Sequence, residues 1–200
     1  MSEITKIGSA EWIFWRRERI TATDAAIILS ISPYGKPIDL WAEKLGLKEP
    51  PPINEWMIRG QQLEGIARDK FEEETGLLVF PKTVQHKTIP YLAATLDGIT
   101  LELDAMVEIK CNGPKNHALA LKGELAPHHN AQMQHQMECV GLDFAYYYSF
   151  DGDKGVIVEV KRDQEFIDNM LEKEFDFWQC LQTFTPPLQN KKHTRKKSSL

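Results

Sequence analysis

An acid and a lysine stand two positions apart in the apolar stretch Glu108-Ile109-Lys110, and a second acid, Asp97, precedes Glu108 by eleven residues. Residues two apart on a strand point to the same face, so Glu108 and Lys110 share one. Two carboxylates can hold Mg²⁺, which takes oxygen ligands and keeps several waters. Lys110 could then orient or deprotonate a water, or stabilise charge building on a scissile phosphate. The pattern predicts metal-assisted phosphodiester hydrolysis.

The same pattern also occurs as a solvated ion pair on ordinary strands, so its surroundings must decide between the two interpretations. Glu64 lies on the preceding predicted helix, and a later helix carries Gln132, Gln134 and Gln136. These neighbouring polar groups favour a catalytic site.

Five short motifs occur in order between about residues 12 and 161: R-I-T-A-T-D (19–24), R-G-x-x-x-E (59–64), L-D-G (96–98), E-I-K-C (108–111) and A-Q-M-Q (131–134). In this series the chain resembles the YqaJ and lambda-exonuclease group of viral recombinases, within the PD-(D/E)XK nuclease superfamily. The resemblance implies an α/β (α+β) fold, with a restriction-endonuclease-like core whose central mixed β-sheet is flanked by helices.

The resemblance also implies roles for the central residues. Asp97 and Glu108 match metal-binding carboxylates for Mg²⁺, with Mn²⁺ as an alternative, and Ile109 would lend its backbone carbonyl to the metal. Lys110 matches the catalytic lysine. Glu64 matches a glutamate that orients this lysine or a water on the metal.

Further residues match positions that handle the water and the DNA end. Gln134 matches a glutamine near the attacking water, and Gln132 is assigned to DNA binding. Arg16 and Thr23 fall where the family carries an arginine and a hydroxyl that hold a 5′ phosphate, with Thr23 in place of the commoner serine. The planar guanidinium group can donate two hydrogen bonds to a phosphate, and the free N–H groups at the start of a helix also bind phosphate. Arg17 and Arg19 are alternatives for the arginine, and Arg19 is kept among the predicted DNA-binding residues.

Together these features predict a 5′-to-3′ exonuclease that digests linear double-stranded DNA from a 5′-phosphorylated end and leaves a 3′ overhang. The resemblance implies a homotrimer, a single-strand annealing protein as partner, and a phage or prophage protein in a bacterial cytoplasm. Two alternatives share the fold: a non-catalytic DNA-end-binding accessory protein and a restriction-type endonuclease. Intact acids and lysine favour the exonuclease over the first, and the short chain leaves no extra recognition segment for the second.

Periodicity and turn residues predict the elements that position these groups. Helices are expected over 8–30, interrupted by a turn-like 19–24, and over 38–46, 54–75, 115–122, 127–140 and 165–183. Strands are expected over 77–80, 92–95, 99–103, 105–110, 144–149 and 155–160.

Length and composition are those of one globular domain: 200 residues, 42% hydrophobic and 26% charged, with a net charge of −5. We predict a single exonuclease domain over 1–188, with a nuclease core at about 54–161 and a basic, mobile tail over 189–200. No apolar run reaches the roughly 20 residues that cross a bilayer, and the N-terminus lacks a signal peptide's apolar core. Three scattered cysteines predict no disulfide framework. A zinc site at His135 and Cys139 is a weaker alternative, since no second ligand pair has suitable spacing.

Overall fold

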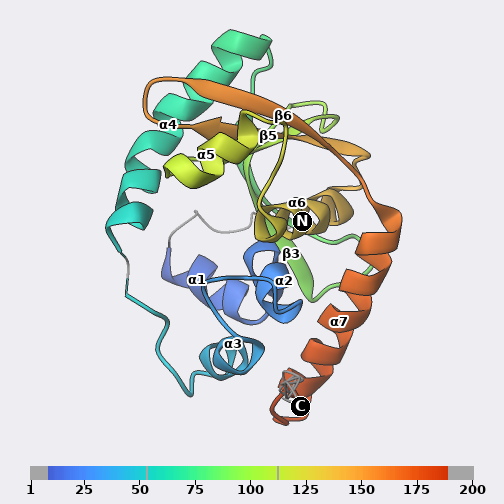
Figure 1. The fold of residues 1–200 in the computed structure, drawn as a ribbon. Coiled ribbons are helices and arrows are strands. Elements are labelled where there is room, and N and C mark those ends of the chain that lie inside the picture. Colours follow the sequence, from blue (N-terminus) through green and yellow to red (C-terminus); the bar gives the residue numbers. More distant parts are fainter. Residues whose placement is uncertain (1–8, 53, 112, 189–200) are drawn as a thin grey trace, which may run out of the picture.

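The computed structural model describes residues 9–52, 54–111 and 113–188. Groups of helices and groups of strands follow one another along them (Figure 1). In chain order they are α1 (Ala10–Arg17), β1 (Ile20–Thr21), α2 (Ala22–Ile28), α3 (Pro37–Lys44), α4 (Glu55–Thr75), β2 (Phe80–Gln85), β3 (Leu92–Ile99), β4 (Met106–Lys110), α5 (Pro114–Ala120), α6 (Pro127–Val140), β5 (Phe144–Phe150), β6 (Gly155–Lys161) and α7 (Gln164–Gln182).

One mixed sheet occupies the centre, with strand order β1-β3-β4-β5-β6 and β2 pairing with β3. β1 runs parallel to β3 and β4 parallel to β5, whereas the other pairs are antiparallel. Parallel neighbours need a crossover, and α5 and α6 provide it between β4 and β5. The expected central mixed sheet flanked by helices is confirmed.

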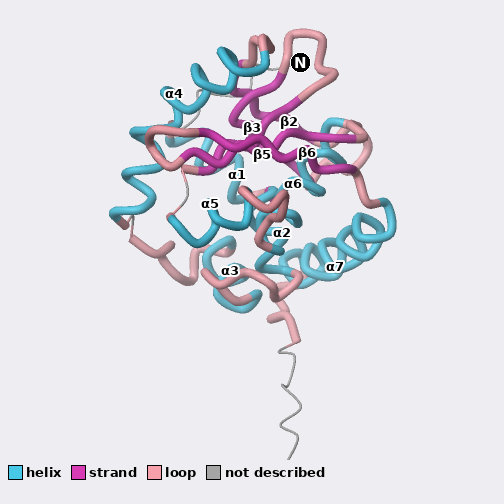
Figure 2. Tube along the Cα trace, turned by 45° about the horizontal axis from the view of Figure 1, so that its top comes forward, coloured by secondary structure: helices cyan, strands magenta, loops and turns pink. Residues whose placement is uncertain are grey.

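The helices cover the two faces of the sheet unequally. In Figure 2 the strands form a middle layer with α4 on one side and α2, α3, α5, α6 and α7 on the other. Under α4, a small apolar core contains Ala67, Phe71 and Ile109. The larger core lies between the sheet and the other helices, and includes Met133 of α6 and Phe177 of α7. Both cores meet at β4, the strand that carries the predicted chemistry.

Local signals explain the boundaries of α4, the longest helix. The side chain of Asn54 accepts a hydrogen bond from the N–H of Met57 at its start. Gly76 ends it in the left-handed conformation, with φ of 72°, which costs glycine little. The predicted helix over 54–75 is therefore confirmed, and it places Glu64 in mid-helix, where the backbone is rigid.

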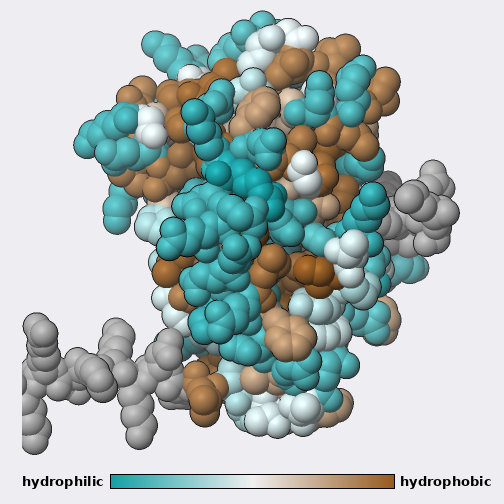
Figure 3. All heavy atoms as spheres, turned by 90° about the vertical axis from the view of Figure 1, so that its right-hand side faces the viewer, coloured by the Kyte–Doolittle hydropathy of each residue, from teal (hydrophilic) through white to brown (hydrophobic). Residues whose placement is uncertain are grey.

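α7 closes the larger core with one apolar stripe. Its buried residues recur three and four positions apart, at Ile167, Met170, Glu174, Phe177 and Leu181. The opposite face of this helix is charged. Seen from the side on which α7 lies, hydrophilic residues form a band down the molecule (Figure 3). The stripe contains a single charged residue, Glu174, which has a buried partner described below.

Two predicted strands are wrong. Residues 77–79 precede the strand, since β2 spans Phe80–Gln85, and the side chain of Glu72 instead accepts a hydrogen bond from the N–H of Val79. Residues 99–103 do not form a separate strand, because β3 ends at Ile99. The Thr100 hydroxyl accepts the N–H of Ala105 in a tight turn, and Leu103 has a φ of 61°.

The two-residue strand β1 was missed. The N–H of Ile20 donates to the carbonyl of Tyr91, 2.8 Å away, where a turn was predicted. All three cysteines are free thiols, as expected. Among the helices described, none is both long and apolar enough to span a membrane. The basic tail predicted over 189–200 lies outside the described residues.

Candidate active site

Asp97, Glu108 and Lys110 meet on neighbouring antiparallel strands. Gly98 of β3 pairs with Val107 of β4, which sets Asp97 beside Glu108. The Asp97 carboxylate accepts a hydrogen bond from the N–H of Ile109 at 2.9 Å, and the Lys110 ammonium contacts Glu108 Oε1. The structure thus brings the predicted carboxylates and lysine together, although eleven residues separate the two acids in sequence.

Close packing of β3 against β4 requires Gly98, the residue that follows Asp97. A Cβ on Gly98 would lie 2.6 Å from a methyl group of Val79 and 2.8 Å from one of Val107. Such distances are too short for carbon atoms, so a larger residue would push β3 away from β4. Gly98 therefore sets how closely Asp97 approaches Glu108.

Glu108 is almost wholly buried, with 2% of its surface exposed, and both of its oxygens are held by amides. Gln132 Nε2 lies 2.6 Å from Oε1, and Gln136 Nε2 lies 2.5 Å from Oε2. A buried carboxylate requires such donors, because burial without partners costs several kcal/mol. The two glutamines are four residues apart and share one face of α6. The carboxylate is therefore fixed in one orientation.

Gln132 contacts a predicted metal ligand, so its place in the structure is nearer to the metal site than its predicted DNA-binding role implied. Gln136 was not predicted, although its spacing from Gln132 is the signal that could have found it. The side chain of Gln134 does not contact Glu108, unlike those of Gln132 and Gln136. Its Nε2 donates to the carbonyl of Lys161 at 2.9 Å, and its Oε1 accepts the N–H of Asp163 at 2.9 Å.

The structure places Gln134 away from the carboxylates, whereas the family resemblance implied a place beside the attacking water. Two residues along a helix correspond to a turn of about 200°, so Gln134 cannot share a face with Gln132. It joins α6 to the segment that enters α7. The residue whose amide reaches the carboxylates is Gln132 instead.

Glu64 reaches the cluster through Arg68. Arg68 Nη2 donates to Glu64 Oε1 at 2.7 Å, while its Nε donates to the carbonyl of Asp97 at 2.9 Å. Burial, together with the nearby carboxylates of Glu108 and Glu64, raises the pKa of Asp97 well above its ordinary value, and Lys110 offsets this only in part. Three carboxylates, those of Glu64, Asp97 and Glu108, therefore lie around two cations, Arg68 and Lys110.

This surplus of negative charge fits a divalent cation with oxygen ligands. Asp97 and Glu108 offer carboxylate oxygens, and Ile109, which follows Glu108, offers a backbone oxygen. Across the described ranges, no three acidic, histidine or cysteine side chains converge as a complete metal-binding set. Mg²⁺ suits such a partial set, because it keeps several of its waters.

Lys110 remains positively charged beside these acids. Burial alone would lower its pKa, but Glu108 and Asp97 together hold the pKa above its ordinary value. The ammonium is therefore a stable source of positive charge at the edge of the cluster.

A second polar cluster lies at the start of the chain. Arg16 Nη2 is 3.4 Å from the hydroxyl of Thr21 and 3.3 Å from that of Thr23, and the guanidinium stacks 4.5 Å from the ring of Trp12. Beneath it, buried Asp24 accepts the N–H and hydroxyl of Thr21. The structure thus joins the predicted pair Arg16 and Thr23, and adds Thr21, whose place in the same motif was the available signal.

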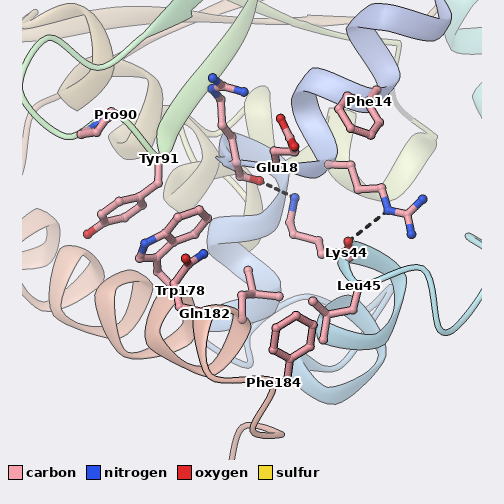
Figure 4. Close-up of a pocket in the computed structure, with 12 residues that line it drawn as sticks. Phe14, Glu18, Lys44, Leu45, Pro90, Tyr91, Trp178, Gln182 and Phe184 are labelled. Atoms are coloured by element: carbon pink, nitrogen blue, oxygen red, sulfur yellow. Dashed lines mark hydrogen bonds between the residues drawn. The ribbon is translucent and has the colours of Figure 1, made fainter.

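The two alternative arginines are used elsewhere. Arg19 donates to the carbonyl of Trp15 at 2.9 Å and stacks on its ring at 4.3 Å. Arg17 donates from Nε to the carbonyl of Lys44. Both line a hollow of about 750 Å³ between α1, α3 and α7, in which the rings of Tyr91 and Trp178 stack on each other, 4.8 Å apart (Figure 4). The arginine beside Thr23 is therefore Arg16, and Arg19 is not part of that cluster.

The histidine and cysteine pair considered for zinc has another role. His135 Nδ1 lies 2.7 Å from Glu174 Oε1, and its Nε2 lies 3.0 Å from the carbonyl of Ala93. Both ring nitrogens are engaged, which leaves none for a metal. The zinc alternative therefore fails at this position.

Residues 11–143 match the YqaJ-like viral recombinase domain. The chain belongs to this family. It is 27% identical over 187 residues to the uncharacterized protein YqaJ of Bacillus subtilis strain 168, covering 89% of this chain and 58% of that protein. It is 28% identical over 155 residues to the uncharacterized protein R354 of Acanthamoeba polyphaga mimivirus, covering 68% of this chain and 27% of that protein. The chain thus spans little more than half of one relative and about a quarter of the other.

Solved structures of exonucleases share the fold. An alkaline exonuclease from Laribacter hongkongensis, LHK-Exo, is 26% identical, with a TM-score of 0.75 over 88% of this chain and 94% of that chain. Its complex with dAMP superposes with a TM-score of 0.77. A phage-related exonuclease from Haemophilus somnus 129PT, 14% identical and with a TM-score of 0.61, shares the fold. The predicted family and fold are confirmed.

Proposed function

We propose that this protein is a magnesium-dependent exonuclease that degrades one strand of linear double-stranded DNA in the 5′-to-3′ direction. The observation that carries the proposal is the convergence of Asp97, Glu108 and Lys110, with both oxygens of Glu108 held by amides. The likeness to an alkaline exonuclease over most of the chain supports it. The product would carry a 3′ overhang for single-strand annealing recombination.

The cluster has the groups that phosphodiester hydrolysis requires. Mg²⁺ (or Mn²⁺) held by Asp97, Glu108 and the Ile109 carbonyl would activate a water and offset charge on the phosphate. The amides on Glu108 keep its carboxylate from reorienting during the reaction. Lys110 supplies positive charge where the phosphate gains negative charge as water attacks and the bond to the leaving oxygen breaks. Glu64, whose Oε1 accepts a hydrogen bond from Arg68, would orient Lys110 or a water on the metal.

Direction of digestion is assigned to the second cluster. Arg16 and the hydroxyls of Thr21 and Thr23 form a compact set of donors that matches a terminal phosphate dianion. Anchoring that end determines which phosphodiester meets the carboxylates. The substrate is therefore linear duplex DNA with a 5′-phosphorylated end.

Two features of the proposal rest on the family resemblance alone. They are a homotrimeric assembly and a single-strand annealing protein as partner, in a phage or prophage setting within a bacterial cytoplasm. A mass measurement in solution tests the first, and co-purification with a single-strand annealing protein tests the second.

The deciding experiment is digestion of linear duplex DNA, with and without a 5′ phosphate, in Mg²⁺ and in EDTA. We expect Mg²⁺-dependent nucleotide release from phosphorylated ends, abolished in Lys110→Ala and unchanged in the control Lys173→Ala, whose exposed lysine lies on α7. Failure of the unaltered protein to digest any linear duplex would favour a non-catalytic end-binding protein. Cleavage of closed circular DNA would instead indicate an endonuclease.

A further inference from the structure

A second hollow, of about 500 Å³, lies where the first turns of α4 meet the start of α5 and the β5–β6 turn. Its walls include Trp56, Arg59, His117 and Leu121. This volume is within the range of roughly 300–1,000 Å³ typical of small-molecule sites. No role in the hydrolysis proposed above uses any of these residues.

Trp56 is the principal wall, and it is far more exposed than a tryptophan that stabilises a core. Its side chain is 61% exposed and Leu121 is 66% exposed. The Trp56 ring lies over Gly113, at ordinary contact distance from where a Cβ would stand, 3.6 Å. A flat aromatic surface is therefore open to solvent on one side and backed by protein on the other.

Strand β5 and the β5–β6 turn hold Arg59 and His117 in place. Arg59 donates to the carbonyl of Asp151 at 2.5 Å, and its guanidinium lies 5.9 Å from the centre of the Trp56 ring. His117 Nδ1 is 2.9 Å from the hydroxyl of Ser149. An aromatic face flanked by a fixed cation and an imidazole suits a planar, polar-edged group attached to a phosphate chain.

The hollow lies beside the catalytic cluster. Gly113 in its wall follows Lys110 by three residues, and one helix, α4, carries both Arg59 of the hollow and Glu64 of the cluster. A DNA strand bound at the carboxylates would therefore lie within reach of the hollow.

We propose that the Trp56 hollow binds an unpaired nucleobase of the DNA held at the catalytic cluster, by stacking on the indole. The inference rests on the proposed nuclease function and adds a DNA contact to it. Trp56 precedes Glu64 by eight residues, about 12 Å along a helix. At roughly 3.4 Å per stacked nucleotide this places the base about three to four nucleotides from the scissile phosphate.

The test is abasic scanning of bound DNA. A Lys110→Ala protein, which should bind without cleaving, is titrated in Mg²⁺ with oligonucleotides that lack one base at each successive position of either strand. We expect one position, three to four nucleotides from the cleavage site, to weaken binding about 5- to 100-fold, the range for loss of one stacked base. Adding Trp56→Ala should cause the same loss on intact DNA and remove the abasic effect, whereas Trp56→Phe should largely retain binding.

Phe175→Ala is the matched control, because Phe175 is a half-exposed aromatic residue on α7, across the molecule from α4 (Figure 1). Equal affinity for all abasic oligonucleotides would overturn the inference and leave the nuclease proposal standing. So would a Trp56→Ala protein that binds DNA normally but changes its oligomeric mass, since the hollow would then be an interface between copies. Continued cleavage by Lys110→Ala would count against the proposed function itself, and with it the inference.

Discussion

Replacing Glu174 with leucine is expected to lower the free energy of unfolding by about 3–5 kcal/mol at neutral pH, the usual cost of leaving one member of a buried ion pair without its partner. The side chains of His135 and Glu174 are 1% and 0% exposed and 2.7 Å apart. Since total stability of a protein is only about 5–15 kcal/mol, the variant should be severely weakened.

The hydrogen bonds of His135 give this prediction its pH dependence. The carbonyl of Ala93 can only accept, so His135 Nε2 must carry a proton, while Nδ1 faces the Glu174 carboxylate. Burial opposes the charged form, but Glu174, with a contribution from Cys139, raises the pKa of His135 well above its ordinary value. The ring is therefore an imidazolium that donates to both acceptors.

The raised pKa of His135 determines whether stability rises or falls with pH. Stability contributed by His135 is fully present below its unfolded pKa, about 6.5, and is lost as pH rises through the folded value. The gap between wild type and Glu174→Leu should be largest at pH 6 and shrink toward alkaline pH, by at most about 1.36 kcal/mol per pH unit.

Urea denaturation at pH 6 and pH 9.5, followed by tryptophan fluorescence, measures this gap. Glu172→Leu, at an exposed site on the same helix, should change stability by no more than about 0.5 kcal/mol. The double variant His135→Leu/Glu174→Leu should lose less than the sum of the two single variants. An equal gap at both pH values, or strictly additive losses, would refute the reasoning.

Three further outcomes test the sites. Gln136→Met should weaken Mg²⁺ binding and activity about 10- to 100-fold, as loss of groups that orient metal ligands commonly does, whereas Gln134→Met should leave Mg²⁺ affinity unchanged; isothermal titration calorimetry with Mg²⁺ compares them. Arg16→Ala should abolish the preference for 5′-phosphorylated over 5′-hydroxyl ends, a loss of about 10-fold or more, while Arg19→Ala should retain it; initial digestion rates on the two substrates decide. Mg²⁺ at a free concentration 100 times its Kd should raise the free energy of unfolding by about 2.7 kcal/mol. Thermal denaturation would show this as a rise in Tm, which Asp97→Asn should abolish.

Much of the catalytic cluster could be read from the sequence because its geometry is local. Glu108 and Lys110 share a strand face whatever the strand packs against, since the side-chain period is two. Asn54 and Gly76 mark the ends of α4 through short-range hydrogen bonding and backbone conformation. The family followed from the order of the motifs, which needs no coordinates.

Strand boundaries were less predictable, because a strand is defined by its partner. Residues 77–79 have the composition of a strand. The N–H groups of Leu77 and Val79, however, donate hydrogen bonds to side chains of the preceding helix instead of to a neighbouring strand. Ile20 pairs with a segment about seventy residues away in the chain, and nothing in its own neighbourhood signals this.

The sequence by itself therefore determined which acids and which lysine form the cluster, and the family to which the chain belongs. Only the tertiary structure decided that Gln132 and Gln136, rather than Gln134, face Glu108, and that Arg16 lies beside Thr23. Helical spacing shows which residues share a face, but not which face is turned toward the sheet. That rotation is set by packing of apolar side chains such as Met133 and Met137 against strands distant in sequence.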